Sequence, residues 1–184
     1  MHHPEENPWQ ITSEQVAYDN PWINVTEYQV INPSGNPGIY GKVHFKNVAI
    51  GVLALDDDLN TYLVGQFRFA LGQYSWEMPE GGGPVGTDPL ASAKRELLEE
   101  TGYQAKRMTY LTGGPVSAGF GSEMISIYRA TGLKKVGPGG GVDGEDIRIH
   151  EVRVDRVRAW LRKKQREGLL VDSKIFAGLY FVNQ

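Results

Sequence analysis

The sequence contains no cysteine among its 184 residues. Disulfide bonds, thiolate metal sites, iron–sulfur clusters and cysteine nucleophiles are therefore excluded. Any metal chemistry must use oxygen or imidazole ligands. His44 and His150 have no histidine partner at ligand spacing, and we interpret both as structural.

An excess of positive charge and long apolar runs are also missing. The 19 Lys+Arg against 22 Asp+Glu give a net charge of -3, which provides no basic field for nucleic acid. No apolar run approaches the roughly 20 residues that span a bilayer, and residues 1–10 are acidic and polar. We therefore expect a soluble cytoplasmic protein without a nucleic-acid or membrane partner. The 40% of hydrophobic residues can build one core of ordinary size.

The hydrophobic pattern predicts several β-strands. Residues 22–31 and 39–45 are rich in branched and aromatic side chains around a Pro/Gly/Asn loop, which is typical of a hairpin. Residues 48–55 are almost continuously apolar, as in a strand covered on both faces. Three aspartates separate that strand from residues 61–69, and we expect these two strands to pair antiparallel. Further strands are predicted at residues 108–112, 124–130 and 147–154.

Three helices are predicted. The first has Asp88 as N-cap and Pro89 at its first position, and it ends at Gly102. The others cover about residues 155–167 and 172–182. Strands on both sides of one helix, followed by two terminal helices, predict an α/β fold in which a mixed sheet packs between helical layers.

The first predicted helix carries Glu96, Glu99 and Glu100 on one arc, apart from its apolar strips. Like charges four residues apart cost about 0.2–0.5 kcal/mol. Acids in the last turn face the negative end of the helix dipole, at about 0.3–1 kcal/mol each. Stability does not account for the cluster, so either a solvated acidic face or a functional site explains it.

The segment before this helix is a strand end that runs into glycines, Trp76-Glu77-Met78-Pro79-Glu80-Gly81-Gly82-Gly83. The helix itself reads Arg95-Glu96-Leu97-Leu98-Glu99-Glu100-Thr101-Gly102-Tyr103. Together the two segments resemble the Nudix box, in which Gly, five residues, Glu and seven residues precede Arg-Glu-apolar-x-Glu-Glu-x-Gly-apolar. Thr87 stands where the box has its first glutamate, and Asp88 is a candidate substitute. The resemblance implies that this change weakens metal affinity or local order without abolishing the chemistry.

The clustered carboxylates suit Mg²⁺ or Mn²⁺, which bind well when substrate phosphates complete their coordination. The resemblance implies that Glu96 and Glu100 are the main metal ligands and that Glu99 is an additional or orienting one. The Glu80 carbonyl is the implied backbone ligand, and Arg95 the residue that holds the glutamates in place. An ordinary surface ion pair is the alternative for Arg95.

Three further segments indicate the substrate class: residues 66–69, 115–123 and 144–148. With the box they are similar to the ADP-ribose and nucleoside-diphosphate-sugar pyrophosphatase branch of the Nudix hydrolases, over about residues 48–148. That branch implies a Nudix-type α/β/α sandwich preceded by an antiparallel β segment.

Candidate substrate-binding residues lie in and before these segments. Arg68 is a candidate phosphate clamp, with an ordinary surface arginine or ion pair as the alternative. Phe67, Phe69 and Tyr28 are candidates for stacking on the base. Glu123 is a further candidate for substrate binding. For each aromatic residue, a place in the core or in an interface is the alternative.

The resemblance also implies a division of the chain and an oligomeric state. Residues 1–46 would form an N-terminal β segment, and residues 47–184 the Nudix hydrolase domain. In this branch such a segment commonly helps to form a dimer that shares substrate contacts. We therefore expect a homodimer.

The glycine-rich stretch 133–146 is the predicted lid, because it has too little side-chain packing to hold a rigid shape by itself. Glu145, near its end, resembles the base-bearing position of ADP-ribose pyrophosphatases. Asp143, Glu99 and Glu123 compete for the role of catalytic base.

The resemblance therefore implies metal-dependent hydrolysis of a nucleoside diphosphate-sugar to a nucleoside monophosphate and a sugar phosphate. A housecleaning nucleoside triphosphate pyrophosphohydrolase is the alternative enzyme. The alternative that is not an enzyme is a non-catalytic nucleotide-sensing module. The identity of the base and of the sugar is not readable from the sequence.

Overall fold

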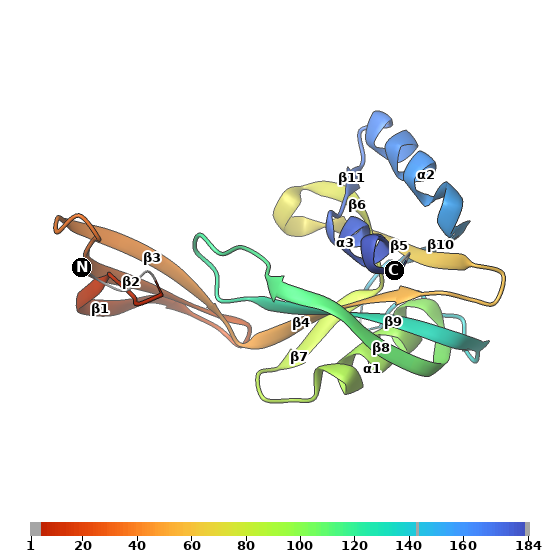
Figure 1. Cartoon of the computed structure of the whole chain (residues 1–184), viewed down its shortest axis with the longest axis horizontal. Coiled ribbons are helices and arrows are strands. Elements are labelled where there is room, and N and C mark those ends of the chain that lie inside the picture. The colour runs from red at the N-terminus through yellow and green to blue at the C-terminus, as the bar shows by residue number, and fades with distance from the viewer. Residues whose placement is uncertain (1–4, 143, 183–184) are drawn as a thin grey trace. The chain divides into compact units, whose positions relative to one another are not determined.

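The computed structural model describes residues 5–142 and 144–182, and Figure 1 shows how their helices and strands are arranged. The chain divides into two compact units. The first comprises Met1–Val48 and Pro115–Met124, and the second Ala49–Gly114 and Ile125–Gln184. Each unit is described separately below.

The first unit is an antiparallel sheet with the order β1-β2-β3. Its strands are β1 (Gln10–Asp19), β2 (Ile23–Ile31) and β3 (Pro37–Phe45). The predicted hairpin is β2–β3, which pairs from Ile23↔Phe45 to Ile31↔Pro37. The sequence did not predict β1, because all its residues are exposed and no buried face imposes an apolar alternation.

The second unit contains two four-stranded sheets. One has the order β7-β4-β9-β8, from β4 (Asn47–Ala54), β7 (Glu80–Pro84), β8 (Tyr103–Pro115) and β9 (Met124–Lys135). The other has the order β10-β5-β6-β11, from β5 (Asn60–Arg68), β6 (Gln73–Glu77), β10 (Arg148–Arg153) and β11 (Leu170–Val171). A short 3-10 turn, Phe69–Leu71, joins β5 to β6.

The predicted antiparallel pairing of residues 48–55 with 61–69 is wrong. These segments form β4 and β5, which lie in different sheets and whose backbones are bridged at Leu55↔Thr61, an isolated bridge outside the strand ladders. β4 pairs in parallel with β9, whereas β5 lies between β10 and β6. Most of β4 is buried, as the sequence predicts, but its backbone hydrogen bonds go to a strand that is distant in the sequence. The aspartate turn therefore carries the chain from one sheet to the other.

The three predicted helices are confirmed as α1 (Pro89–Thr101), α2 (Val154–Arg166) and α3 (Lys174–Val182). Asp88 caps α1 by accepting a hydrogen bond from the Leu90 backbone N–H at 3.0 Å. Gly102 ends α1 with a φ of 71°, a left-handed conformation that glycine adopts without steric cost.

Helices cover the second unit from opposite sides, with α1 on one side of the sheets and α2 and α3 on the other (Figure 1). Ala93 and Leu97 of α1 pack in one core cluster, together with Ile50 and Val52 of β4. The other cluster joins α2 and α3 to the two sheets through buried side chains, among them Leu53, Leu63, Met78, Leu161 and Ile175. The layered α/β fold predicted from the sequence is confirmed.

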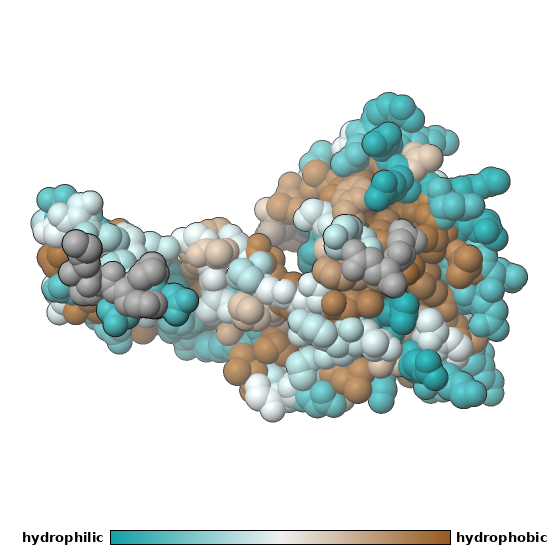
Figure 2. All heavy atoms as spheres, in the orientation of Figure 1, coloured by the Kyte–Doolittle hydropathy of each residue, from teal (hydrophilic) through white to brown (hydrophobic). Residues whose placement is uncertain are grey.

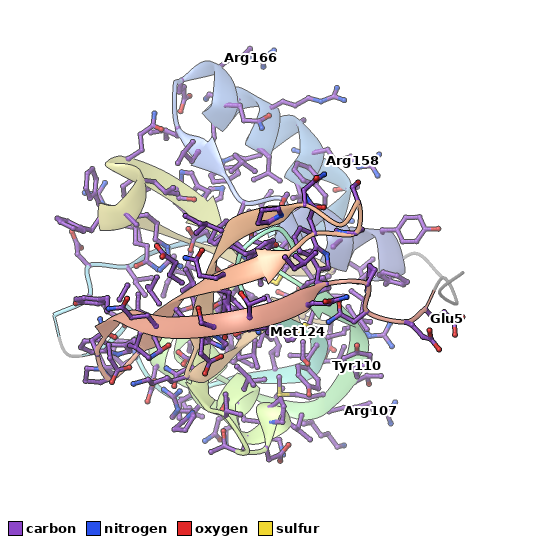
Figure 3. All side chains as sticks on the ribbon, turned by 90° about the vertical axis from the view of Figure 1, so that its left-hand side faces the viewer. Glu5, Arg107, Tyr110, Met124, Arg158 and Arg166 are labelled. Atoms are coloured by element: carbon purple, nitrogen blue, oxygen red, sulfur yellow. The ribbon has the colours of Figure 1, made fainter. Side chains whose placement is uncertain are left out.

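The outer face of α2 is strongly basic. Figure 2 shows hydrophilic side chains over this helix, and in Figure 3 Arg158 and Arg166 point away from the sheets. Val157 and Leu161 are its buried residues. The basic residues thus form the polar face of an amphipathic helix. Within the part of the chain that the structure describes, none of the helices has the length and apolarity needed to cross a membrane.

Candidate active site

The carboxylates of α1 meet the backbone of β7 at the centre of the candidate site. The Glu80 N–H donates to Oε2 of Glu100 at 2.9 Å, and the Gly82 N–H donates to Oε1 of Glu96 at 3.1 Å. Between these donors, a Cβ on Gly81 would lie 2.3 Å from the carboxyl carbon of Glu96. Only glycine at this position lets the Glu96 carboxylate lie against the strand.

Arg95 ties two of these glutamates to the same strand. Its guanidinium donates to Glu99 Oε2 at 2.6 Å, to Glu96 Oε1 at 2.7 Å and to the Gly82 carbonyl at 2.6 Å. The contacts that the box implies for Arg95 are therefore present. They fix the orientation of Glu96 and Glu99, whereas any catalytic role of Arg95 stays a prediction.

Glu100 is the most deeply buried acid of α1, with 2% of its surface exposed. Burial raises the pKa of Glu100 to about 9, and the hydrogen bond from the Glu80 N–H lowers it in part. The negative charges of Glu96, Glu80 and Glu145 raise this pKa further. Burial also raises the pKa of Glu96, although Arg95 opposes this shift. Glu100 thus has less positive charge around it than it needs to ionise at neutral pH.

The glycine-rich predicted lid is attached to the end of α1. The N–H groups of Gly140 and Gly141 donate to the carbonyls of Glu100 and Glu99 at 2.8 and 3.0 Å. Gly139 has a φ of 73°, and a Cβ there would lie 2.5 Å from the Thr101 carbonyl carbon. The loop therefore takes its shape from the open carbonyls of the helix end. Closure over a substrate stays a prediction.

Glu145 lies in the same unit, at the end of this loop. Its Oε2 accepts a hydrogen bond from the Val142 N–H at 3.0 Å, and its charge contributes to the raised pKa of Glu100. The predicted base is thus close to the carboxylates of α1. Its competitor Asp143 lies outside the described residues.

Arg68, the predicted phosphate clamp, has carboxylate partners in this structure. Its Nε lies 2.9 and 3.0 Å from the two carboxylate oxygens of Glu77, and a second nitrogen also contacts Glu77. The same nitrogen lies 3.2 Å from Oε1 of Glu80. About a third of the Arg68 side chain, 36%, is exposed. Phosphate binding by Arg68 stays a prediction, and it would have to use that exposed part.

Sequence reasoning missed a second acidic group, made of Glu77, Glu80 and Asp172. One carboxylate oxygen from each lies within 4.8 Å of the others. Lys174 lies beside it, with Nζ 3.3 Å from Oε1 of Glu80 and in contact with Asp172. Burial raises the pKa of Glu80 to about 8, against the opposing effect of Lys174. Asp172 and Lys174 lie far from the box in sequence, so no local signal could have placed them here.

The remaining predicted substrate contacts are spread over both units. Phe67 belongs to the second unit and is 61% exposed, as a residue that stacks on a base could be. Tyr28 and Glu123 belong to the first unit, where the Tyr28 hydroxyl lies 3.0 Å from Nε2 of His44. Roles for these three residues in substrate binding stay predictions.

Comparison with known families identifies the box. A family model described as the NUDIX domain matches residues 45–171, which is most of the chain. The chain belongs to the Nudix family. A second model, described as the nucleoside diphosphate sugar hydrolase N-terminal domain, matches residues 9–43. The resemblance inferred from the sequence is confirmed.

Individual relatives agree with this Nudix assignment. The chain is 31% identical over 135 residues to a methanol dehydrogenase activator of Bacillus methanolicus, covering 73% of this chain and 71% of the relative. It is 32% identical over 141 residues to an ADP-ribose pyrophosphatase of Mycobacterium tuberculosis, covering 73% and 64%. An ADP-ribose pyrophosphatase of Bacillus subtilis is 40% identical over 85 residues, 46% of each chain.

A solved structure supports the same fold. The crystal structure of an ADP compounds hydrolase matches with a TM-score of 0.81 and 16% identity, over 98% of this chain and 95% of that one. At this identity the likeness shows the fold alone. The predicted Nudix fold is confirmed.

The box departs from the Nudix pattern at Thr87. Its hydroxyl donates to the Pro84 carbonyl at 2.7 Å, so the side chain closes the turn between β7 and α1. The carboxylate of Asp88 is engaged in capping α1. Asp88 therefore has a structural task here, and its proposed substitution for the missing glutamate stays a prediction.

The residues on α1 fit a divalent metal. Their donors are all oxygens, which Mg²⁺ and Mn²⁺ prefer. The buried Glu100 carboxylate accepts a hydrogen bond from the Glu80 N–H and has a raised pKa, so a divalent cation would supply the missing positive charge. The group of Glu77, Glu80 and Asp172 fits less well, because Arg68 and Lys174 already contact it.

Proposed function

We propose that the chain hydrolyses the diphosphate bond of a nucleoside diphosphate-sugar of the ADP-ribose type. The observation that carries this proposal is the pair of family matches, a Nudix domain over residues 45–171 and the nucleoside diphosphate sugar hydrolase N-terminal domain over residues 9–43. Relatives named ADP-ribose pyrophosphatase in two bacteria support the same substrate class. The products would be a nucleoside monophosphate and a sugar phosphate.

In this proposal Glu96 and Glu100 hold a divalent ion, Mg²⁺ or Mn²⁺, with Glu99 and the Glu80 carbonyl as further ligands. When bound, the ion would polarise a phosphoryl oxygen and neutralise charge on the leaving phosphate. Arg95 keeps Glu96 and Glu99 oriented through the hydrogen bonds described above.

Glu145 is the proposed general base. Water attacks one phosphorus, Glu145 accepts a proton from that water, and the bond from this phosphorus to the bridging oxygen breaks. The leaving phosphate keeps the bonding electrons. The nearness of Glu145 to Glu100, which raises the pKa of Glu100, supports this assignment over an ordinary solvated loop acid.

Substrate binding is assigned to Arg68, Phe67, Tyr28 and Glu123. The exposed part of the Arg68 guanidinium would contact a phosphate oxygen, and the exposed ring of Phe67 would contact the base. Tyr28 and Glu123 belong to the first unit.

We also propose that the protein is a homodimer that uses the first unit as a contact. The β1 strand is exposed along its whole length, and its edge carries Ile11, Val16 and Tyr18 with more than half of each surface exposed. A long exposed strand with apolar side chains is a surface that proteins commonly cover. Light scattering at micromolar concentration should give twice the mass of the 20.4 kDa chain. A monomer that is active at nanomolar concentration would contradict this proposal.

A substrate panel with Mg²⁺ tests the reaction. Nucleotide sugars, dinucleotides and nucleoside triphosphates are incubated separately, and phosphomonoester products are detected after phosphatase treatment. We expect turnover of ADP-ribose or a related nucleotide sugar. Turnover of triphosphates alone would favour a housecleaning enzyme, and binding without turnover would favour a sensing module. The cytoplasmic location stays a prediction.

A further inference from the structure

The carboxyl-terminal helix α3 is built into the active-site side of the second unit. Ile175 of α3 is fully buried, and Gly178 packs beside Met78, where an added Cβ would lie 3.3 Å from the Met78 methyl carbon. Met78 is fully buried and precedes Glu80 by two residues. The helix therefore supports the strand end that carries the Glu80 backbone.

Lys174, the first residue of α3, holds the side chain of Glu80. Its Nζ lies 3.3 Å from Oε1 of Glu80, and only 24% of the lysine side chain is exposed. Lys174 is itself fixed by Asp172, which contacts Nζ and accepts a hydrogen bond from the Lys174 N–H at 2.7 Å. The Asp172 N–H in turn donates to the Trp76 carbonyl at 2.9 Å. Because both its backbone N–H and its Nζ are bound by Asp172, Lys174 has little freedom to move away from Glu80.

Glu80 connects this lysine to the proposed metal ligands. Its side chain faces Lys174 and Arg68, whereas its backbone N–H donates to Oε2 of Glu100. Its Oε2 is buried and has no hydrogen-bond partner, so the attachment of this carboxylate depends on the two cations at Oε1. Without Lys174, the acidic group of Glu77, Glu80 and Asp172 would keep Arg68 as its one contacting cation among the described residues.

We propose that Lys174 is a positioning residue that acts through Glu80 to hold Glu100 in its metal-binding orientation. The inference rests on the proposed function of the α1 glutamates. Groups that orient metal ligands typically change metal affinity or activity by about 10–100-fold when removed. A purely electrostatic role gives the opposite sign, because loss of a nearby positive charge should strengthen the binding of a cation.

The test is Lys174→Met, which keeps a long unbranched side chain and removes the positive charge. We expect Mn²⁺ binding, measured directly by electron paramagnetic resonance titration, to weaken by about 10-fold or more. The turnover number should fall, while KM for the substrate changes little at saturating Mn²⁺. Lys174→Arg, which restores a cation, should recover most of the affinity.

Lys163→Met is the matched control. Lys163 is an exposed lysine of α2, and its ion-pair partner is Glu167 of the same helix end, 3.9 Å from Nζ. This variant should match the wild type in Mn²⁺ affinity and turnover. Melting temperatures of all variants define a measurement temperature at which each is folded.

The outcomes separate the two proposals. Folded Lys174→Met with unchanged or tighter Mn²⁺ binding would overturn the positioning role, even if its melting temperature were lower. Failure of Lys174→Arg to recover affinity would overturn the requirement for a cation. A wild-type protein that neither binds Mn²⁺ nor hydrolyses a nucleotide sugar would instead overturn the proposed function.

Discussion

Two acidic groups lie side by side in the second unit, and they differ in the positive charge that the protein gives them. The group on α1, Glu96, Glu99 and Glu100, is contacted by Arg95, which pairs with Glu96 and Glu99. Glu77, Glu80 and Asp172 have two contacting cations, Arg68 and Lys174. Both groups contain a buried glutamate with a raised pKa. Clustered acids alone therefore do not mark a metal site, because the positive charge that the protein already supplies decides whether a cluster can still bind a cation.

Loss of one carboxyl group from the first acidic group should have the largest effect. Glu100→Gln should abolish most turnover, because an amide cannot supply the anionic oxygen that a divalent ion needs. In the absence of metal this variant should melt at or above the wild-type temperature, since it removes a buried acid that other carboxylates repel. Turnover is measured with Mg²⁺ and melting in a chelator. Near-normal Mg²⁺-dependent activity would contradict the proposed site.

Glu145→Gln tests whether the first group needs a separate base. A general base typically contributes about 10²–10⁴-fold, so the turnover number should fall by that factor with little change in KM or in Mg²⁺ dependence. Initial rates over a range of substrate and Mg²⁺ concentrations provide the measurement. If Glu145→Gln keeps its rate while Glu99→Gln or Glu123→Gln loses it, the base is misassigned and the metal site stands.

The two raised pKa values predict how stability depends on pH without metal. The folded protein keeps a proton on Glu100 up to about pH 9 and on Glu80 up to about pH 8, whereas the unfolded chain releases both near the ordinary value of 4.5. The folded state binds more protons in this window, so the free energy of unfolding should fall as pH rises from about 5 to 9. Melting temperatures in a chelator across this range measure the slope.

The same titration separates the two groups. Glu100→Gln should flatten part of the slope, and the remaining slope reports Glu80. Added Mg²⁺ should raise the melting temperature most at high pH, where Glu100 can ionise to bind it. A melting temperature that rises with pH in a chelator, in both proteins alike, would contradict the raised pKa of Glu100.

The smallest effect is expected from the same kind of substitution in the second group. Asp172→Asn keeps the side-chain oxygen that accepts from the Lys174 N–H, and it leaves two carboxylates facing two cations. The substitution weakens the contact of residue 172 with Nζ of Lys174, but Nζ keeps Glu80 as a partner. Stability should change by less than about 1 kcal/mol, since asparagine accepts from the Lys174 N–H as well as aspartate. Urea unfolding and turnover are the measurements. Loss of activity as severe as in Glu100→Gln would show that the two groups are one site.

Local chemistry explains which parts were predictable from the sequence. α1 was predicted almost to the residue, because Asp88, Pro89 and Gly102 act within one turn of its ends. The box glutamates and Arg95 were found for the same reason, since their spacing along one helix is a local property. The hairpin β2–β3 was also a local feature, with its loop between two apolar runs.

Long-range choices were not predictable. The apolar pattern of β4 showed that it is buried but not that β9, rather than β5, lies beside it. The contact of Arg68 with Glu77 was not predicted, because it depends on the pairing of β5 with β6. Asp172 and Lys174 joined the site through the packing of α3, which leaves no trace in the spacing of charges.

Gly81 shows how one missing side chain restricts sequence variation. Its φ is not in the left-handed region, so alanine could adopt the backbone conformation without strain. The obstacle is the Glu96 carboxylate, which would have to leave the space that a methyl group needs. A Cβ added at Gly114 or at Gly119 would lie in open space. Substitutions are therefore expected to be tolerated at Gly114 and Gly119 but not at Gly81, where a side chain would displace the Glu96 carboxylate.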